Sequence, residues 1–231
     1  MNPDIPMTPP KPDGRLMSAA PFVRGGVIAD IGTDHAYLPV WLLLTGRVQG
    51  AVATDIREGP LRTAARTVER YGLSGKISLI LADGLAGIEK YHPDDIIIFG
   101  MGGELIASII EKAKWVRDPQ IRLILQPMTR RAELREYLLG HGFNVIDEAT
   151  SEAAGRIYQT ICAEYDGCGG IYNTAELLLG RHNIVRGDEL TRRYAGQLKA
   201  KYRRRKSGKA KAGLDTSEED EVLAALDSLG F

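Results

Sequence analysis

Three aspartates in the first half of the 231-residue chain follow short apolar runs. Asp30 lies near the end of the run 27–31, Asp55 ends the run 51–55, and Asp83 follows the run 77–81. If these runs are parallel strands, their carboxyl ends share one edge of a sheet, where open α/β folds bind small molecules. Each aspartate alone could instead cap a helix N-terminus, but three in register favour a ligand site with acceptors for ribose hydroxyls.

The turn after the first run separates two classes of cofactor. A dinucleotide site needs glycines there, so that bare backbone amides can approach a pyrophosphate. This chain has Gly32 at the first of those positions but Asp34 at the second, and a carboxylate opposes a phosphate. S-adenosylmethionine (SAM) has no phosphate and carries a cationic sulfonium and an amino group, so we expect SAM and disfavour a nicotinamide-dependent oxidoreductase.

A glycine-rich segment, 100–103, follows the apolar run 95–99. Glycine permits positive φ and close approach of the backbone to a ligand or a flat base. A simple tight turn is the alternative, but three glycines in four residues exceed what a turn requires. The predicted cofactor-binding residues are Asp30, Gly32, Asp55, Asp83, Gly84, Gly100, Met101 and Gly102.

The elements that position these residues alternate between apolar runs and helix-like segments. Strands are expected at 27–31, 51–55, 77–81, 95–99 and 122–125, with helices between them. Two more, at 144–148 and 157–163, are separated by about nine residues, too few for a helical crossover, so they form an antiparallel hairpin. The sequence predicts an α/β, Rossmann-like fold with a seven-stranded sheet, in a domain spanning 1–172.

The segment 173–231 differs in character. One or two helices are expected over 174–206, followed by a linker at 206–213. A capping box formed by Thr216 and Glu219 would open a final helix. These helices predict a C-terminal helical hairpin, and a further short helix is expected at 14–20.

Charge is segregated along the chain, although the formal net charge is zero. Residues 174–213 hold 12 Lys and Arg against 3 Asp and Glu, whereas 214–231 hold none against 6. A basic segment favours a polyanionic partner, and a solvated helix face is the alternative. The RNA-contact candidates are Arg192, Arg193, Lys199, Lys201, Arg203, Arg204, Arg205 and Lys206, with Arg15 of the short N-terminal helix added because it lies near the pocket.

Other features restrict the class of protein. No apolar run approaches the roughly 20 residues that span a bilayer, and the proline-rich start has no apolar signal core. We therefore expect a soluble, cytoplasmic protein. Cys162 and Cys168 have no nearby histidines in a zinc-binding pattern, so no metal is expected. No feature of the sequence indicates an oligomer, so a monomer is expected.

Four blocks resemble the TrmK family of bacterial SAM-dependent methyltransferases, which modify N1 of the adenosine at tRNA position 22. These blocks are Asp30-Ile31-Gly32-Thr33-Asp34-His35-Ala36-Tyr37-Leu38-Pro39, Ala82-Asp83-Gly84-Leu85, Gly100-Met101-Gly102-Gly103-Glu104-Leu105-Ile106 and Leu123-Ile124-Leu125-Gln126-Pro127. The resemblance covers essentially the whole chain, since that family joins a Rossmann-like domain to a helical coiled-coil hairpin. Met128 departs from the asparagine expected after Gln-Pro, and some members carry glutamate at Asp55.

The resemblance implies SAM as methyl donor and tRNA as partner, with RNA binding and tRNA modification as the activity. Asp34 is then the candidate catalytic carboxylate, and His35 and Gln126 are candidate orienting groups, although His35 could merely bond at a helix start. The target nucleotide must be flipped into the pocket. Two alternatives remain open: a SAM-dependent methyltransferase acting on another RNA or a small molecule, and a non-catalytic RNA-binding protein.

Overall fold

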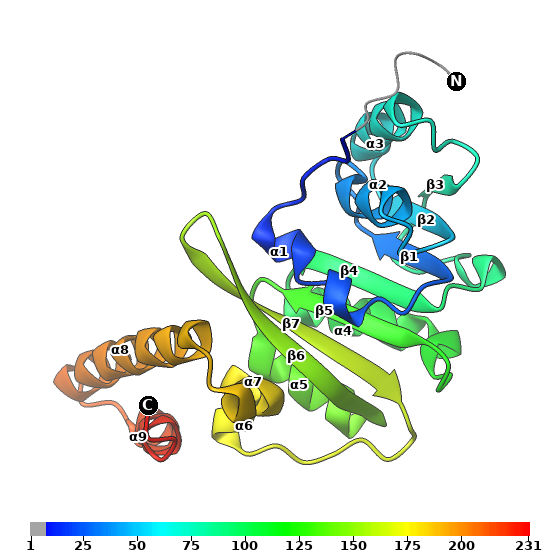
Figure 1. The fold of residues 1–231 in the computed structure, drawn as a ribbon. Helices are drawn as coiled ribbons and strands as arrows, with labels where there is room; N and C mark the ends of the chain where they lie inside the picture. The colour runs from blue at the N-terminus through cyan, green and yellow to red at the C-terminus, as the bar shows by residue number, and fades with distance from the viewer. Residues whose placement is uncertain (1–7) are drawn as a thin grey trace.

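A seven-stranded sheet forms the centre of the computed structural model, which describes residues 8–231 (Figure 1). Its strand order is β3-β2-β1-β4-β5-β7-β6; β1 to β5 are parallel, and β7 runs antiparallel to both β5 and β6. The predicted α/β sheet with a terminal antiparallel hairpin is therefore confirmed. The strands are β1 (Val27–Ile31), β2 (Gly50–Asp55), β3 (Ile77–Leu81), β4 (Asp95–Met101), β5 (Arg122–Pro127), β6 (Phe143–Ala153) and β7 (Arg156–Tyr165).

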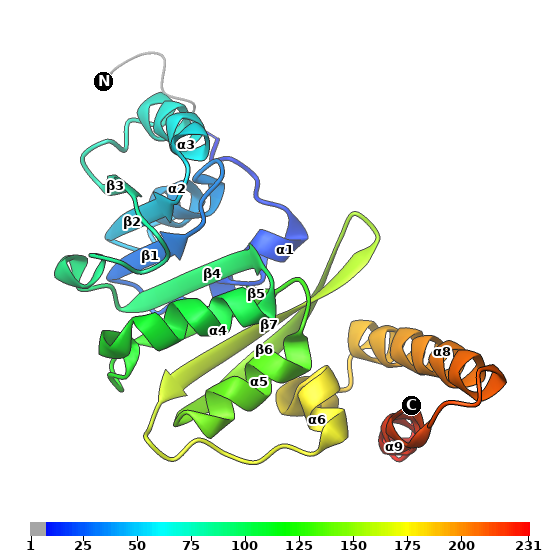
Figure 2. The same cartoon turned by 180° about the vertical axis from the view of Figure 1, so that it is seen from behind.

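Helices cover both faces of the sheet, because the central strands are apolar on both sides. Ile96 and Ile98 of β4 belong to the core under α4 and α5, whereas Ile97 belongs to the core under α2 and α3 (Figure 2). The first seven residues of the predicted 1–172 domain lie outside the described residues. The helices of this part are α1 (Gly14–Met17), α2 (Tyr37–Leu44), α3 (Glu58–Arg70), α4 (Gly103–Lys112) and α5 (Arg131–Gly140), with 3-10 turns η1 (Ala20–Phe22), η2 (Glu89–Tyr91) and η3 (Lys114–Val116).

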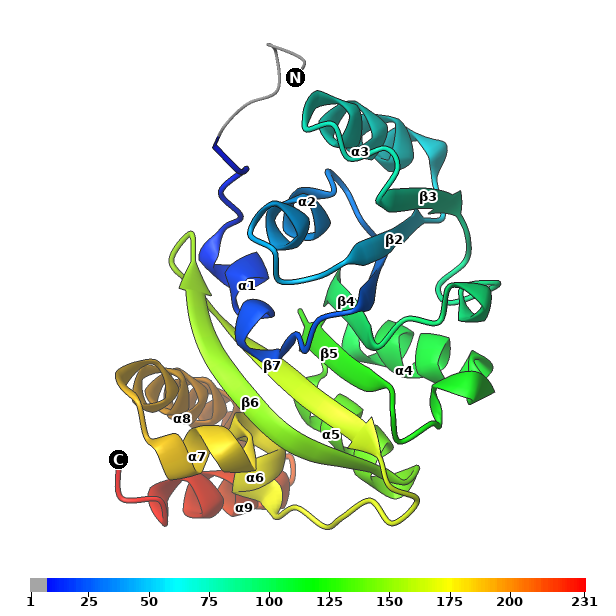
Figure 3. The ribbon, with the colours of Figure 1, turned by 45° about the vertical axis from the view of Figure 1, so that its right-hand side comes forward.

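The terminal hairpin is longer than predicted. Strand β6 continues five residues past the predicted end at position 148, through a polar stretch that lacks the apolar pattern of a core strand. Helix α1 packs against this extension, as Figure 3 shows, and the Ser18 and Thr160 hydroxyls lie 2.6 Å apart. A Cβ on Gly14 would lie 2.6 Å from the Glu152 carbonyl oxygen, so the α1 backbone lies close against β6.

Four helices follow the sheet: α6 (Thr174–Leu179), α7 (Arg181–Arg186), α8 (Glu189–Lys211) and α9 (Ser217–Asp227). The predicted linker at 206–213 is wrong, since α8 continues to Lys211, where Lys209 bonds the Glu219 carboxylate at 2.8 Å. The predicted Thr216–Glu219 capping box is also wrong, because the Thr216 hydroxyl donates to Asp220 Oδ2 at 3.1 Å and makes no side-chain cap. An unpredicted capping box, Asn173 with Glu176, opens α6 instead.

Helices α8 and α9 form the expected antiparallel hairpin. Lys209 near the end of α8 meets the first turn of α9, while Lys199 reaches Asp227 at the end of α9, with a distance of 3.0 Å between Nζ and Oδ1. A small apolar core, separate from the two cores of the sheet, holds the pair together. Its buried members are Leu179, Ala195, Leu198, Val222 and Leu226.

A buried ion pair joins the C-terminal helices to the sheet. The side chains of Arg135 and Glu148 are both fully buried, with Nε and Oε1 2.7 Å apart. The same guanidinium donates to the carbonyl oxygen of Leu177 at 2.8 Å and to Gln159 Oε1 at 3.1 Å. The Glu148 carboxylate also accepts the backbone N–H of His182 at 3.1 Å, so α6 and α7 are fixed to α5 and β6.

Candidate active site

The carboxyl ends of β1, β2 and β3 enclose a cavity of about 140 Å³, here called the Asp55 cavity. Asp55 is buried, and its Oδ1 accepts the backbone N–H of Arg57 at 2.8 Å. Asp83 is exposed at the mouth, where its Oδ2 lies 3.7 Å from Lys112 Nζ. Two of the three aligned aspartates are thus brought to one cavity, which Gly32, Gly84 and Met101 also line.

Gly32 marks the place where backbone must come close to a neighbouring side chain. Its φ is +78°, which strains any larger residue, and a Cβ there would lie 2.3 Å from Met101 Cε, so the end of the Met101 side chain would have to move. Gly100 has the same positive φ of +78°. Gly102 does not: its φ is −69° and it serves as the N-cap of α4, so its lack of a side chain leaves room for Thr129 rather than permitting an unusual turn.

A second and larger cavity, of about 370 Å³, is also lined by Gly32 and is here called the Asp30 cavity. Asp30 is 9% exposed. Burial raises the pKa of its carboxyl to about 6, and a hydrogen bond with Thr33 and the attraction of Arg15 oppose that rise. A carboxylate that is costly to ionise in the ligand-free protein favours a cationic ligand group beside it.

Asp34 and His35 lie at the rim of the Asp30 cavity, where Asp34 is exposed and His35 is half-buried. His35 Nε2 is 3.2 Å from Asp34 Oδ2, and the imidazole stacks on the Tyr37 ring with centroids 5.0 Å apart at 10°. Tyr37 is 41% exposed, so the pair presents aromatic surface to solvent. Sequence reasoning passed over Tyr37; the signal was an aromatic residue two positions after a histidine in the same turn.

Gln126 is fully buried and lines neither cavity. Its Oε1 accepts the Gly100 backbone N–H at 3.3 Å and faces Arg15 Nη1 at 3.4 Å. Its Nε2 lies 3.1 Å from the Pro127 carbonyl oxygen and 3.7 Å from Met128 Sδ. The amide therefore holds the glycine turn and Arg15 in place, which makes it a positioning residue in this arrangement.

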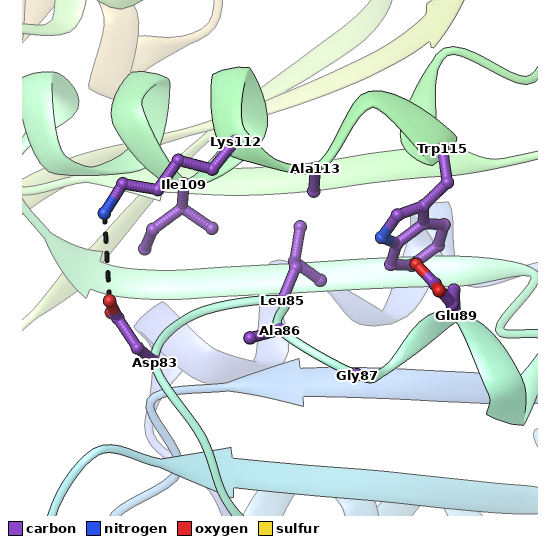
Figure 4. Close-up of a pocket in the computed structure, with 9 residues that line it drawn as sticks. All are labelled: Asp83, Leu85, Ala86, Gly87, Glu89, Ile109, Lys112, Ala113 and Trp115. Carbon is purple, nitrogen blue, oxygen red and sulfur yellow. Dashed lines mark ion pairs between the residues drawn. The ribbon is translucent and has the colours of Figure 1, made fainter.

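A third pocket, of about 190 Å³, adjoins the Asp55 cavity (Figure 4). The two share Asp83 and Ile109, and the Lys112 side chain extends toward Asp83 across the opening. Leu85 and Trp115 provide an apolar wall. A ligand whose hydroxyls bind Asp55 could therefore place an apolar group in this adjoining pocket.

The RNA-contact candidates on α8 divide into two sets. The first is already paired with acids within 4.0 Å, chiefly on α9, and consists of Arg193, Lys199, Arg203, Arg205 and Lys206. The second has no ion pair with any described residue: Lys201 and Arg204 line a groove of about 870 Å³ between α8 and the start of α5, and Arg192 lies over the Phe231 ring. Most of the basic residues that the sequence concentrates in this segment therefore form ion pairs, chiefly with the acidic residues of α9.

Arg15 lies apart from the α8 residues with which it was grouped, since it lines the Asp30 cavity. Within residues 8–231, no group of three or more His, Cys, Asp or Glu side chains is arranged to hold a metal ion. None of the helices in the same range is long and apolar enough to cross a membrane.

Known proteins match this chain over most of its length. A methyltransferase-domain family model matches residues 13–161. The tRNA (adenine(22)-N(1))-methyltransferase of Bacillus subtilis is 41% identical over 167 residues, 72% of this chain and 70% of the relative. A crystal structure of the B. subtilis m1A22 tRNA methyltransferase TrmK has a TM-score of 0.79 and 34% identity, covering 95% of each chain. A Streptococcus pneumoniae candidate tRNA (m1A22) methyltransferase, solved with SAM, has a TM-score of 0.82 and 30% identity over 93% of this chain and 97% of its own.

Proposed function

Because the chain belongs to the TrmK family of tRNA (adenine(22)-N1)-methyltransferases, we propose that it transfers the methyl group of SAM to N1 of adenosine 22 in tRNA. One structural observation supports the proposal independently of the family membership. Two cavities share Gly32, one with acceptors for a nucleoside and the other with a carboxylate and an aromatic pair at its rim. A nucleoside cofactor and a second flat base can therefore meet at this residue.

The residues present fit SAM, which supplies a methyl group on a cationic sulfur. Asp55 accepts the ribose hydroxyls, and Asp83 lies toward the adenine end. Gly32 and Gly100 let the backbone approach the cofactor, and Met101 packs beside it. Asp30 faces the cationic amino group, which recovers part of the cost of keeping this carboxylate ionised in a buried position.

The target adenine binds at the rim of the Asp30 cavity. The exposed faces of His35 and Tyr37 offer a stacking surface for a base taken out of the RNA. The lone pair of N1 lies in the ring plane, so the reaction needs alignment more than a strong base. Asp34 then stabilises the positive charge that develops on the adenine, or accepts a proton from its N6 amino group.

The RNA-binding surface includes the α5–α8 groove and the exposed basic side chains along α8. Lys201 and Arg204 are free to meet phosphates, whereas the paired cations can do so only by sharing or releasing their acidic partners. A tRNA substrate also agrees with a cytoplasmic location and with the division into a catalytic domain, 1–172, and a helical unit, 173–231.

The deciding experiment incubates the full chain with SAM and an unmodified tRNA transcript, then locates methylation by nuclease digestion and mass spectrometry. We expect N1-methyladenosine at position 22. A matched transcript with guanosine at position 22 should gain no methyl group. Methylation of the guanosine transcript, or of a different nucleotide, would overturn the proposed target, and the absence of methylation in both would overturn the activity.

A further inference from the structure

We propose that Arg15 binds the carboxylate of the methionine moiety of SAM and is not an RNA contact. This assignment rests on the proposed function, because it concerns the cofactor of that reaction. Its basis is that Arg15 lines the Asp30 cavity, whereas none of the α8 residues with which the sequence grouped it does so.

The Asp30 cavity presents both signs of charge to a ligand. Asp30 is buried in it, and the Arg15 side chain is 24% exposed and close enough to attract the Asp30 carboxylate. The methionine moiety of SAM is an α-amino acid, with an ammonium and a carboxylate on one carbon. A cavity with one carboxylate and one guanidinium complements such a zwitterion, whereas an RNA phosphate would bring an anion toward Asp30.

The Arg15 guanidinium is held in place but largely unbonded. It has five N–H donors in a fixed fork. Among the described residues its side chain makes one hydrogen bond, the 3.4 Å contact with Gln126 Oε1, and a 3.9 Å ion pair with exposed Asp13. Gln126 in turn binds the Gly100 amide, and a Cβ on Gly100 would lie 3.1 Å from Arg15 Nη1. Donors thus remain free beside the backbone that the cofactor approaches, as bidentate carboxylate binding requires.

The cavity has two other cationic or ionisable basic side chains, and neither fits the carboxylate as well. Lys11 is exposed, so its ammonium is well solvated. His35 is paired with Asp34 at the rim. Arg15 is the cation of the cavity wall that lies next to both Asp30 and the glycine turn.

Calorimetric titration of the full-length protein tests the assignment with two ligands that differ in one group. SAM has the carboxylate, and decarboxylated SAM lacks it while keeping the amino group and the sulfonium. Arg15→Met should weaken SAM binding about 10- to 100-fold and change the binding of decarboxylated SAM less than about threefold. Arg15→Lys should lie between Arg15→Met and the unmodified protein, because it keeps the charge without the fork. Lys11→Met is the matched control and should bind both ligands normally.

Each other outcome overturns the assignment in a different way. Equal weakening for both ligands by Arg15→Met would mean that the residue supports the cavity and not the carboxylate. A SAM-specific loss in Lys11→Met alone would assign the carboxylate to Lys11. Normal SAM affinity in Arg15→Met with weakened tRNA binding would restore the RNA contact. Absence of SAM binding by the unmodified protein would instead refute the proposed function itself.

Discussion

The Asp30 cavity and the α8–α9 hairpin use charge in opposite ways. In the cavity, Asp30 is buried without a close ion-pair partner, and its raised pKa records the cost. In the hairpin, a strongly basic helix packs beside an acidic one, and the Lys209 and Arg205 side chains reach the same carboxylate, that of Glu219. Each region is charged in the sequence, but most charges of the hairpin are paired within it, whereas buried Asp30 has no ion pair among the described residues.

The difference indicates where ligands act. A buried charged group that has no ion-pair partner in the folded protein can gain one from a bound ligand, whereas a charge that is already paired gains little. The cavity should therefore respond to mutation through binding and catalysis. The hairpin should respond through stability and salt dependence.

The largest effect is expected outside both regions, at the buried Arg135–Glu148 pair that joins α6 and α7 to the sheet. Arg135→Met leaves the Glu148 carboxylate buried without its cation, so the free energy of unfolding should fall by about 3 to 5 kcal/mol in urea denaturation. Arg122→Met is the matched control, since its ion pair with Glu164 is partly exposed, and it should cost much less. Equal losses would show that burial of the pair does not set the contribution of a charge in this protein.

The next largest effect is expected for Asp34→Ala, which tests a role in the methyl-transfer step separately from a role in SAM binding. Asp34 is exposed at the rim, so its loss should leave SAM affinity within about threefold and reduce the single-turnover methylation rate about 10²- to 10³-fold. Rapid-quench assays with saturating SAM and tRNA give the rate, and calorimetry gives the affinity. Equal losses in the two measurements would demote Asp34 to a cofactor ligand.

Asp30→Asn should stabilise the ligand-free protein. The folded carboxyl has a pKa of about 6, against an ordinary 3.8, because burial disfavours its ionised form. The folded state therefore holds the proton more tightly, and its stability falls as the pH rises from about 4 through 6. The variant should gain up to about 3 kcal/mol over the unmodified protein at pH 7.5 and almost nothing at pH 4.

Urea denaturation at several pH values measures this difference. The two proteins differ only at this side chain, so the pH dependence of their stability difference reports the ionisation of Asp30. SAM should reverse the order at pH 7.5, because only the carboxylate attracts its amino group. A stability difference that does not change with pH would refute the assigned cost of ionisation.

Much of the sheet could be predicted because each parallel strand, and the ligand-binding residue that follows it, lies within a few consecutive positions of the sequence. The runs at 27–31 and 77–81 match β1 and β3 without error, and the acidic turn separated SAM from a dinucleotide. The far half of β6 was missed because its polar residues pair with β7 and pack against α1, and neither contact has a sequence period. The ion pairs of α8 were not predicted for the same reason: most of their acidic partners are more than ten residues away and become neighbours only when the hairpin folds.

The smallest effect tests that last point directly. Lys201→Gln with Arg204→Gln removes two cations that have no ion pair among the described residues, and both line the α5–α8 groove. If they meet phosphates, tRNA affinity should fall about 5- to 10-fold, and the slope of log affinity against log salt should become shallower by about 2. Fluorescence anisotropy with labelled tRNA at several KCl concentrations measures both quantities.

The matched pair is Arg205→Gln with Lys206→Gln, which removes the same charge from the two positions after Arg204. These side chains are already bound to Glu218, Glu219 and Asp220, although Arg205 also lines the groove. Its tRNA affinity should change less than about threefold and its salt slope should stay the same, because these cations are compensated before RNA arrives. A loss as large as that of the free pair would mean that tRNA draws the paired cations away from α9. The acidic side chains of α9 would then compete with RNA phosphates for the basic side chains of α8. In the hairpin, as in the cavity, a bound ligand would become the partner of a charged side chain.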